Sequence, residues 1–185
     1  MSSGPASSGR RVLIAIVTGL PGEVIQQWRH DHDPRQARRI PPHATLCYEA
    51  PPIGNAGALD RQIRHAFPGP VTVTLGGVYE FANHDGTFFT EMTDTSALSA
   101  ARTRLFDGAF CPLAGRQDFT WHVTCVRYPE DAKRESLRAA ARDLTAAIAE
   151  APTWIVDTIA WMELHDGIYE PLRIWSLREQ SQPTR

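Results

Sequence analysis

The sequence has few cysteines and no long apolar run. Its three cysteines, at positions 47, 111 and 125, form no Cys-x-x-Cys pair. An odd number of scattered thiols argues against a disulfide scaffold and favours a reducing compartment, so we expect a cytoplasmic protein. The apolar run near the start covers only residues 12–17, far short of the ~20 residues that a membrane-spanning helix needs. We therefore expect no membrane segment and interpret this run as a buried first strand.

The chain also lacks an excess of either charge. Its 185 residues include 19 basic and 21 acidic side chains, for a formal net charge of −2. This balance argues against a protein that coats nucleic acid by bulk charge, whereas a small anionic substrate could still bind in a local basic pocket. The length and composition predict one globular domain at 11–178, a disordered Ser- and Gly-rich tail at 1–10 and a short C-terminal tail at 179–185.

Hydrophobic periodicity alternates between strand-like and helix-like segments. We expect strands at 12–18, 43–49, 71–81, 87–92, 119–127, 154–164 and 172–177, and helices starting at Pro21 and covering 58–67, 96–106 and 130–150. The segment 35–42 is expected to be a basic loop that ends in proline. This order of elements repeats weakly in the two halves of the chain. Mixed strands and helices with several hairpins favour an α+β fold of two related lobes, each a β-α-β-α-β-β unit, with antiparallel sheets.

Two of the expected strands carry the same short motif. His43 and Thr45 form a His-x-Thr sequence, and His122 and Thr124 form a second one 79 residues later. Residues i and i+2 of a strand point to the same face, about 6.6 Å apart, so each strand offers an imidazole beside a hydroxyl. Two facing imidazoles form an acid–base pair near neutral pH, and two hydroxyls can donate hydrogen bonds to phosphate oxygens. The pattern predicts a phosphodiester site in which one histidine activates water and the other protonates the leaving oxygen.

The paired motifs His43-x-Thr45 and His122-x-Thr124 resemble the 2H phosphoesterase superfamily, specifically its bacterial RNA 2′,3′-cyclic phosphodiesterase and 2′-5′ RNA ligase branch. The resemblance covers roughly residues 11–178. It implies a bilobal fold around a central cleft, catalysis without a metal or other cofactor, and RNA ends or small nucleotides as substrates. It also implies hydrolysis of 2′,3′-cyclic phosphates or related 2′-5′ linkages, with His122 activating water and His43 protonating the ribose oxygen.

Two alternatives remain open within this interpretation. One is a 2′-5′ RNA ligase that acts in the joining direction. The other is a non-catalytic module that binds RNA ends or nucleotides in the same cleft, although binding alone would not require two matched acid–base groups. Nothing in the sequence indicates an obligate protein partner, and we expect a monomer.

Basic and aromatic side chains near the motifs are candidate substrate contacts. Arg127, five residues after His122, matches a basic residue that often follows the second motif of the family and is expected to bind phosphate. Arg39 lies in the basic segment before the first motif, and a guanidinium suits phosphate binding. Tyr48 and Trp121 could stack on a base. A proline often stands at the position of Trp121 in the family, which leaves the substrate subtype open.

A metal site is the structural alternative for the two histidines, because Cys47 and Cys125 follow them closely in the sequence. Strand alternation argues against it. Cys125 is expected on the face opposite to His122, and Cys47 on the face of His43 but about 13 Å along the strand. The histidines and aspartates at 30–33 are expected at a solvated helix end. The sequence therefore predicts no metal site.

Overall fold

A computed structural model of the chain describes residues 10–48, 56–82, 86–106, 120–127, 129 and 133–178. The expected tails, the loop expected at 107–117 and most of the turn expected at 83–86 lie outside the described residues. Nearly all of the expected strands and helices fall inside them.

The described strands form one antiparallel sheet. They are β1 (Arg11–Ile16), β2 (His43–Tyr48), β3 (Val71–Glu80), β4 (Phe88–Thr93), β5 (His122–Val126), β6 (Thr153–Val156), β7 (Thr158–His165) and β8 (Ile168–Ser176). Their order across the sheet is β6-β3-β4-β5-β2-β1-β7-β8. The expected α+β fold with antiparallel strands is confirmed. The two halves of the sheet meet at β2 and β5, where Ala44 pairs with Val123.

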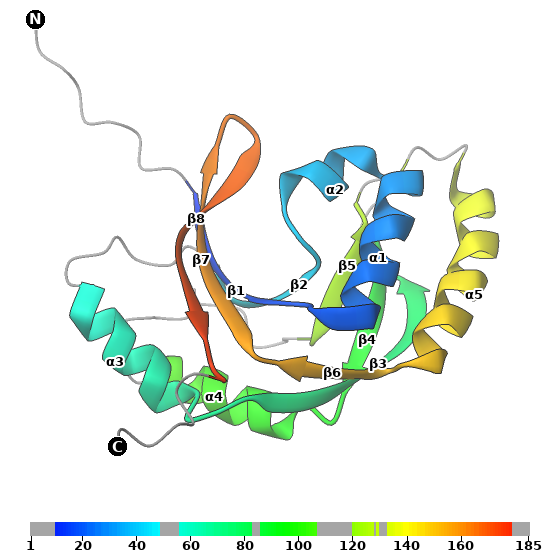
Figure 1. The fold of residues 1–185 in the computed structure, drawn as a ribbon. Helices are drawn as coiled ribbons and strands as arrows, with labels where there is room; N and C mark the ends of the chain where they lie inside the picture. Colours follow the sequence, from blue (N-terminus) through cyan, green and yellow to red (C-terminus); the bar gives the residue numbers. More distant parts are fainter. Residues whose placement is uncertain are drawn as a thin grey trace, which may run out of the picture.

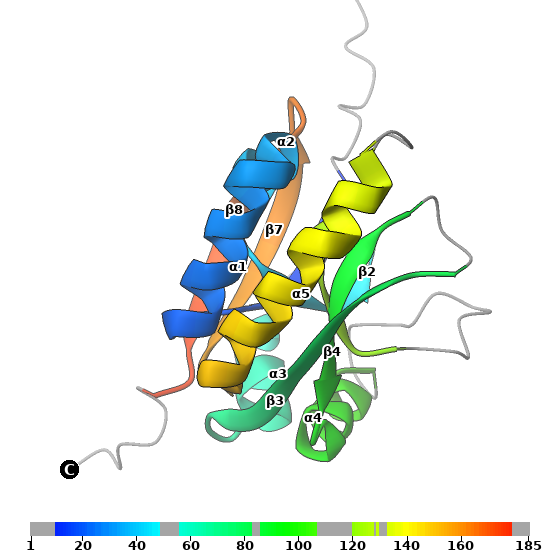
Figure 2. The same ribbon diagram turned by 90° about the vertical axis from the view of Figure 1, so that its right-hand side faces the viewer.

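The helices pack around the two halves of this sheet. They are α1 (Gly19–His32), α2 (Pro34–Arg39), α3 (Ala56–Ala66), α4 (Ser96–Phe106) and α5 (Arg134–Glu150). Helices α1 and α5 pack against each other and against β5 and β3, whereas α3 packs against α4 (Figures 1 and 2). No helix in the described part of the chain is long and apolar enough to cross a membrane.

The residues that alternate with the motif positions build the main core. Ala44, Leu46, Val123 and Cys125 are buried and cluster with apolar side chains of α1, α3, α4 and α5. Burial of this apolar surface is the main force that holds the helices on the sheet. The motif residues lie on the opposite face of β2 and β5, where they are only partly buried. The helices cover one face of β2 and β5, and the motif side chains on the other face stay accessible to a substrate.

The segment 35–42 is not the expected loop, because helix α2 occupies Pro34–Arg39. Asp33 caps this helix, accepting a hydrogen bond at its Oδ1 from the main-chain N–H of Gln36 at 2.9 Å. Proline at the first helical position is favourable, since the missing N–H would have no partner there. The same proline explains why α1 ends at His32, as the sequence predicted.

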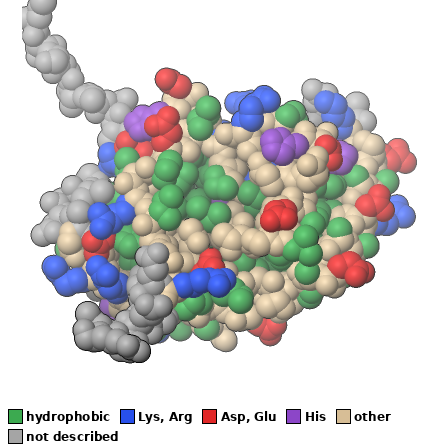
Figure 3. All heavy atoms as spheres, in the orientation of Figure 1, with side chains coloured by type: hydrophobic (Ala, Val, Ile, Leu, Met, Phe, Trp, Pro, Cys, Tyr) green, Lys and Arg blue, Asp and Glu red, His purple; other side chains and the backbone are tan. Residues whose placement is uncertain are grey.

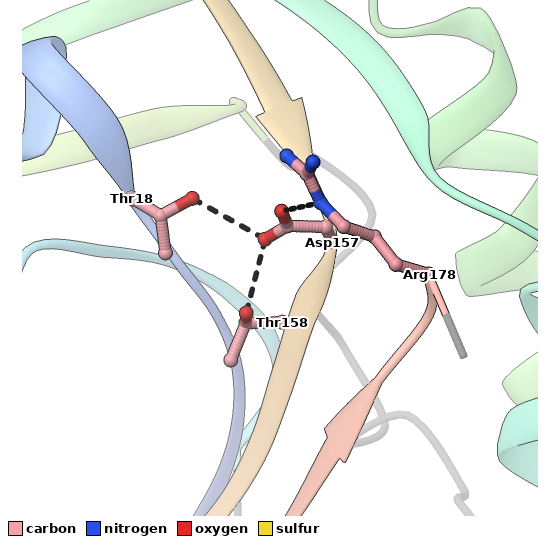
Figure 4. A network of polar contacts seen from close by, with 4 residues as sticks. All are labelled: Thr18, Asp157, Thr158 and Arg178. Atoms are coloured by element: carbon pink, nitrogen blue, oxygen red, sulfur yellow. Dashed lines mark hydrogen bonds and ion pairs between the residues drawn. The ribbon is translucent and has the colours of Figure 1, made fainter.

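The strand expected at 154–164 is divided at Asp157. Strand β6 before this residue pairs with β3, and β7 after it pairs with β1, so the chain crosses here between the two halves of the sheet. The carboxylate of Asp157, which is 8% exposed, accepts hydrogen bonds from the hydroxyls of Thr18 and Thr158 and from Arg178 (Figure 4). Thr18 lies where the chain leaves β1 for α1. This network therefore connects the crossing between β6 and β7 to the point where the chain passes from β1 into α1.

Candidate active site

The register between β2 and β5 brings the two His-x-Thr motifs together. The strands pair through the central residue of each motif. The adjoining positions of an antiparallel ladder place His43 opposite Thr124 and Thr45 opposite His122, all on one face. In a regular ladder, the diagonal pair His43 and His122 lies about 7–8 Å apart, a gap on the scale of one phosphate group.

The two imidazoles make the same main-chain contact. Nδ1 of His43 lies 2.7 Å from the carbonyl oxygen of Pro41, and Nδ1 of His122 lies 2.8 Å from that of Thr120. In both motifs the acceptor stands two residues before the histidine. A carbonyl oxygen only accepts, so Nδ1 donates in both rings and Nε2 is the nitrogen that can exchange a proton. The backbone therefore sets the tautomer and orientation of both rings in the same way.

A buried arginine links the two motif strands to α1. Arg29 is fully buried and donates to the carbonyl oxygen of Thr124 from Nε, at 3.1 Å, and from Nη2. Its Nη1 donates to the carbonyl oxygen of Ile40 at 3.1 Å. Burial lowers the pKa of Arg29 to about 10, so the side chain is still a cation at neutral pH. One positive group thus joins the end of the second motif to the segment that leads into the first.

His43 is held in its neutral form. His43 is partly exposed as a residue, but the loss of water around its ring lowers the pKa of His43 to about 3. The positive charge of Arg29 acts in the same direction, as do the charges of His122 and Arg127. The hydrogen bond to the carbonyl of Pro41 opposes this shift without offsetting it. In the unliganded protein at pH 7, Nε2 of His43 is therefore able to accept a proton.

Aromatic rings surround His122 on the other side of the site. Phe81 and Phe89 meet the imidazole edge-on, with ring centroids 5.0 and 5.7 Å away, and stack on each other at 3.8 Å. Tyr79, which is 50% exposed, lies 6.2 Å from Phe89. Phe89 also pairs with Thr124 across β4 and β5. These contacts restrict the His122 ring and place an apolar wall beside the second motif.

A pocket of about 450 Å³ lies near His43, because the charge of Arg127, one of its lining residues, is close enough to lower the pKa of His43. It is lined by Arg10, Asp33, Arg35, Gln36, Arg39 and Arg127. Two of the predicted substrate contacts, Arg39 and Arg127, therefore come together although they lie far apart in the sequence. We call this site the arginine pocket.

A β-bulge decides which residues of β2 share the motif face. The register of β1 and β2 shifts within the strands, so Cys47 pairs with Leu13 and is only 3% exposed in the main core. The expectation that Cys47 shares the face of His43 is therefore wrong. Tyr48 pairs with Val12 and lies on the motif face, where it packs at the edge of the smaller apolar cluster.

The structure does not bring Trp121 into the site. This side chain is 8% exposed in the main core, and its Nε1 donates to the hydroxyl of Ser99 on α4 at 2.8 Å. It directly precedes His122 in an extended segment and therefore points to the opposite face. Trp121 fixes β5 against α4, and a base cannot stack on it without opening this contact.

Potential metal ligands do not cluster in the described ranges. No group of three or more His, Cys, Asp or Glu side chains among these residues could hold a metal ion. Burial raises the pKa of the Cys125 thiol to about 11, so the side chain is neutral at physiological pH. Asp33, from the acidic segment at 30–33, serves as the cap of α2.

Sequence reasoning missed Arg29 and the aromatic rings beside His122. For Arg29 a signal exists, because Ile25, Trp28 and Arg29 have the i, i+3, i+4 spacing of a single helix face. A charged residue on the apolar face of a helix is unusual and points to a buried contact. The contact of Phe81 with His122 depends on how β3, β4 and β5 align, which no local pattern reveals.

The chain is similar to known proteins over most of its length. A family model described as the 2′-5′ RNA ligase superfamily matches residues 19–168. No curated protein matches. Among solved structures, E. coli LigT complexed with ATP has 18% identity and a TM-score of 0.59, over 94% of this chain and 99% of that one. Its complex with phosphate has 19% identity and a TM-score of 0.57 over the same shares, 94% and 99%.

A third solved structure, described as a phosphoesterase, has 17% identity and a TM-score of 0.52, over 92% of this chain and 99% of that one. At these identities the structural matches establish the fold, which agrees with the antiparallel sheet and its helices. The family model covers well over half of the sequence. The chain therefore belongs to the 2′-5′ RNA ligase superfamily of 2H phosphoesterases.

Proposed function

We propose that this protein is a phosphodiesterase that hydrolyses 2′,3′-cyclic phosphate ends of RNA or nucleotides, or related 2′-5′ linkages. The observation that carries this proposal is the matched pair of imidazoles on one face, each with Nδ1 at a carbonyl oxygen. Membership in a superfamily of phosphoesterases and ligases supports an enzyme. Solved complexes of E. coli LigT with ATP, 3′-AMP and NADP+ support a nucleotide as the class of substrate.

The threonines supply the phosphate contacts in this proposal. The hydroxyls of Thr45 and Thr124 donate to the two nonbridging oxygens, and the charge of Arg127 stabilises the phosphate. Because Thr124 stands opposite His43 and Thr45 opposite His122, each imidazole has a phosphate-binding hydroxyl beside it. Donors fixed in this way stabilise the charge that develops on the phosphate oxygens during attack.

The electrostatics of His43 favour one acid–base order in this proposal. In its neutral form His43 takes a proton from water at Nε2, and the water oxygen forms a new bond to phosphorus. The bond from phosphorus to one ribose oxygen breaks, and protonated His122 gives this oxygen its proton. This order is the reverse of the one that the family resemblance implies. The lowered pKa of His43 supports it only in part, since the ring is neutral and able to accept a proton. The negative charge of a bound phosphate then raises this pKa toward the range that suits a general base.

The test is a panel of nucleoside 2′,3′-cyclic phosphates and 2′-5′ dinucleotides, assayed with the intact protein and with His43→Ala and His122→Ala. Either substitution should lower kcat by at least about 10²-fold, the low end for loss of a general acid or base. His65→Ala is the matched control, because His65 is exposed on α3 and belongs to neither motif strand. Activity should survive EDTA.

Other outcomes would favour the alternatives. Joining of 2′-5′ half-molecules without hydrolysis would identify a ligase. Nucleotide binding without turnover of any substrate in the panel would identify a binding module. Loss of activity in EDTA and its recovery with zinc would contradict the two-histidine mechanism.

A further inference from the structure

We propose that the arginine pocket is a second phosphate subsite, so that the preferred substrate carries a phosphate group besides the one that is cleaved. This inference rests on the proposed function, because it adds a subsite to the same cleft. It selects a dinucleotide or a longer RNA end over a nucleoside 2′,3′-cyclic phosphate.

The charge of the pocket is the first argument. Besides Arg127, which the proposed function assigns to the reacting phosphate, three arginines line it against one carboxylate, that of Asp33. Both oxygens of this carboxylate bind main-chain N–H groups, Oδ1 that of Gln36 at 2.9 Å and Oδ2 that of Arg127 at 3.0 Å. Asp33 therefore serves to join the start of α2 to the end of β5. The pocket keeps an excess of positive charge that attracts an anion.

Three arginines of the pocket, two exposed and one half-buried, have no acidic ion-pair partner within the described ranges. No carboxylate there forms an ion pair with Arg10, Arg35 or Arg39. The guanidinium carbon of Arg39 instead lies 5.6 Å from the centre of the Tyr169 ring. This cation–π contact orients the side chain but leaves its hydrogen-bond donors available for an oxyanion. Closely spaced like charges are unfavourable, and a bound phosphate relieves their repulsion.

The position of the pocket is the second argument. Its residues come from the ends of elements that surround the first motif: Arg10 precedes β1, α2 supplies Arg35 and Arg39, and Arg127 follows β5. Basic side chains over α2 border the group of apolar side chains on this face (Figure 3). A volume of about 450 Å³ is large enough for a nucleotide-sized group. A nucleotide chain with its reacting phosphate between the threonines can therefore extend into the pocket near His43.

The shared chemistry is a phosphate held by guanidinium groups, and two sources can supply it. One is the phosphodiester of a neighbouring nucleotide in RNA, and the other is a diphosphate group. An arginine fork binds either one through paired N–H donors. The experiment therefore includes both.

The test compares kcat/KM for a nucleoside 2′,3′-cyclic phosphate with kcat/KM for a dinucleotide that ends in the same cyclic phosphate. The intact protein should prefer the dinucleotide. The double variant Arg10→Gln, Arg35→Gln should lose about 10-fold to 100-fold in kcat/KM for the dinucleotide, the range for loss of charge-assisted hydrogen bonds. The matched control is Arg38→Gln, because Arg38 is exposed on the same helix but does not line the pocket. Circular dichroism melting checks that each variant is folded.

Binding measurements separate this inference from the proposed function. A dinucleotide 3′-phosphate and inorganic pyrophosphate serve as probes, and neither needs to be cleaved. If the protein cleaves no cyclic phosphate but binding of either probe weakens in the double variant, the subsite stands and the proposed function fails. If the intact protein cleaves both cyclic substrates with the same kcat/KM, and the double variant gives the same two values, the function stands and the subsite is refuted. Stronger binding of pyrophosphate than of the dinucleotide would support the subsite and assign it to diphosphates.

Discussion

The guanidinium of Arg29 donates two hydrogen bonds to the main-chain carbonyl oxygen of Thr124, the last residue of the second His-x-Thr motif. A third hydrogen bond reaches the carbonyl oxygen of Ile40, three residues before His43. Strands β2 and β5 pair through one described residue pair. A single helix side chain therefore holds the two motifs together where the backbone contacts are fewest.

Replacement of this arginine should destabilise the protein. Arg29→Met leaves the carbonyl oxygens of Thr124 and Ile40 buried without their donor, at a cost of about 3 kcal/mol. Arg29→Lys keeps the charge but cannot reach both carbonyls with a planar fork, so its stability should be intermediate. Urea unfolding measures both effects, with the exposed Arg38→Met as control. An Arg29→Met protein that unfolds at the same urea concentration as the parent would contradict this role.

The pH dependence of kcat/KM should reveal His43 as the base. This parameter reports the groups of the free enzyme, and burial together with the charge of Arg29 lowers the pKa of His43 below its ordinary 6.5. A base acts when it is deprotonated, so the acidic limb of the profile should lie well below pH 6.5.

A charge substitution tests the same assignment. The charge of Arg127 is one of the influences that lower the pKa of His43. Arg127→Gln should therefore move the acidic limb to higher pH, in addition to any loss of substrate binding. Arg38→Gln should leave the limb in place. An acidic limb near pH 6.5 that does not respond to Arg127→Gln would show that His43 is not the base.

Local sequence patterns predicted the elements and the shared face of the motifs, because strand alternation depends only on neighbouring residues. They predicted His43 and Thr45 on one face of β2, and the same alternation should have placed Trp121 on the face opposite to His122. The Asp33-Pro34 pair is a helix-start signal that indicates α2. Helix α2 has only six residues, too few for hydrophobic periodicity to distinguish it from a loop.

Other features depend on contacts between distant segments. The bulge in β2 that buries Cys47 and exposes Tyr48 on the motif face arises from the pairing of β2 with β1. The pocket that joins Arg39 to Arg127 requires α2 to lie beside the end of β5. No local pattern encodes either relationship. The sequence therefore identifies candidate residues around the motifs but does not predict where these residues lie relative to one another.

The aromatic contact beside the second motif should tune catalysis. Phe81→Leu removes one edge-on contact with His122 and the stack on Phe89. Aromatic pairs of this kind contribute about 0.5–1.5 kcal/mol, so kcat should fall by about twofold to tenfold. Phe81→Tyr keeps the aromatic ring, so this variant should retain the kcat of the parent protein. Steady-state kinetics of the two variants provides the test, and an equal loss in both would show that the ring geometry has no part in holding His122.

The network at Asp157 should make stability depend on pH. Burial alone would raise the pKa of Asp157, but the hydrogen bonds from Arg178, Thr158 and Thr18 and the charge of Arg178 lower it overall. A carboxyl group whose pKa is lower in the folded than in the unfolded protein stabilises the fold above its unfolded pKa of 3.8. This contribution is lost as the pH falls through the folded value.

Asp157→Asn should therefore lower the free energy of unfolding by about 1–3 kcal/mol at pH 7, since a neutral amide accepts these hydrogen bonds less strongly than a carboxylate. The difference from the parent should narrow below pH 4, where the parent carboxyl becomes protonated. The side chain of Arg178 is 66% exposed, so solvent screens the ion pair and added salt should remove only part of the difference. Urea unfolding at pH 7, 5 and 3.5 measures this trend, with Asp143→Asn on the exposed face of α5 as control. A difference that stays constant from pH 7 to 3.5 would mean that the charge of Asp157 does not stabilise the crossing between the two halves of the sheet.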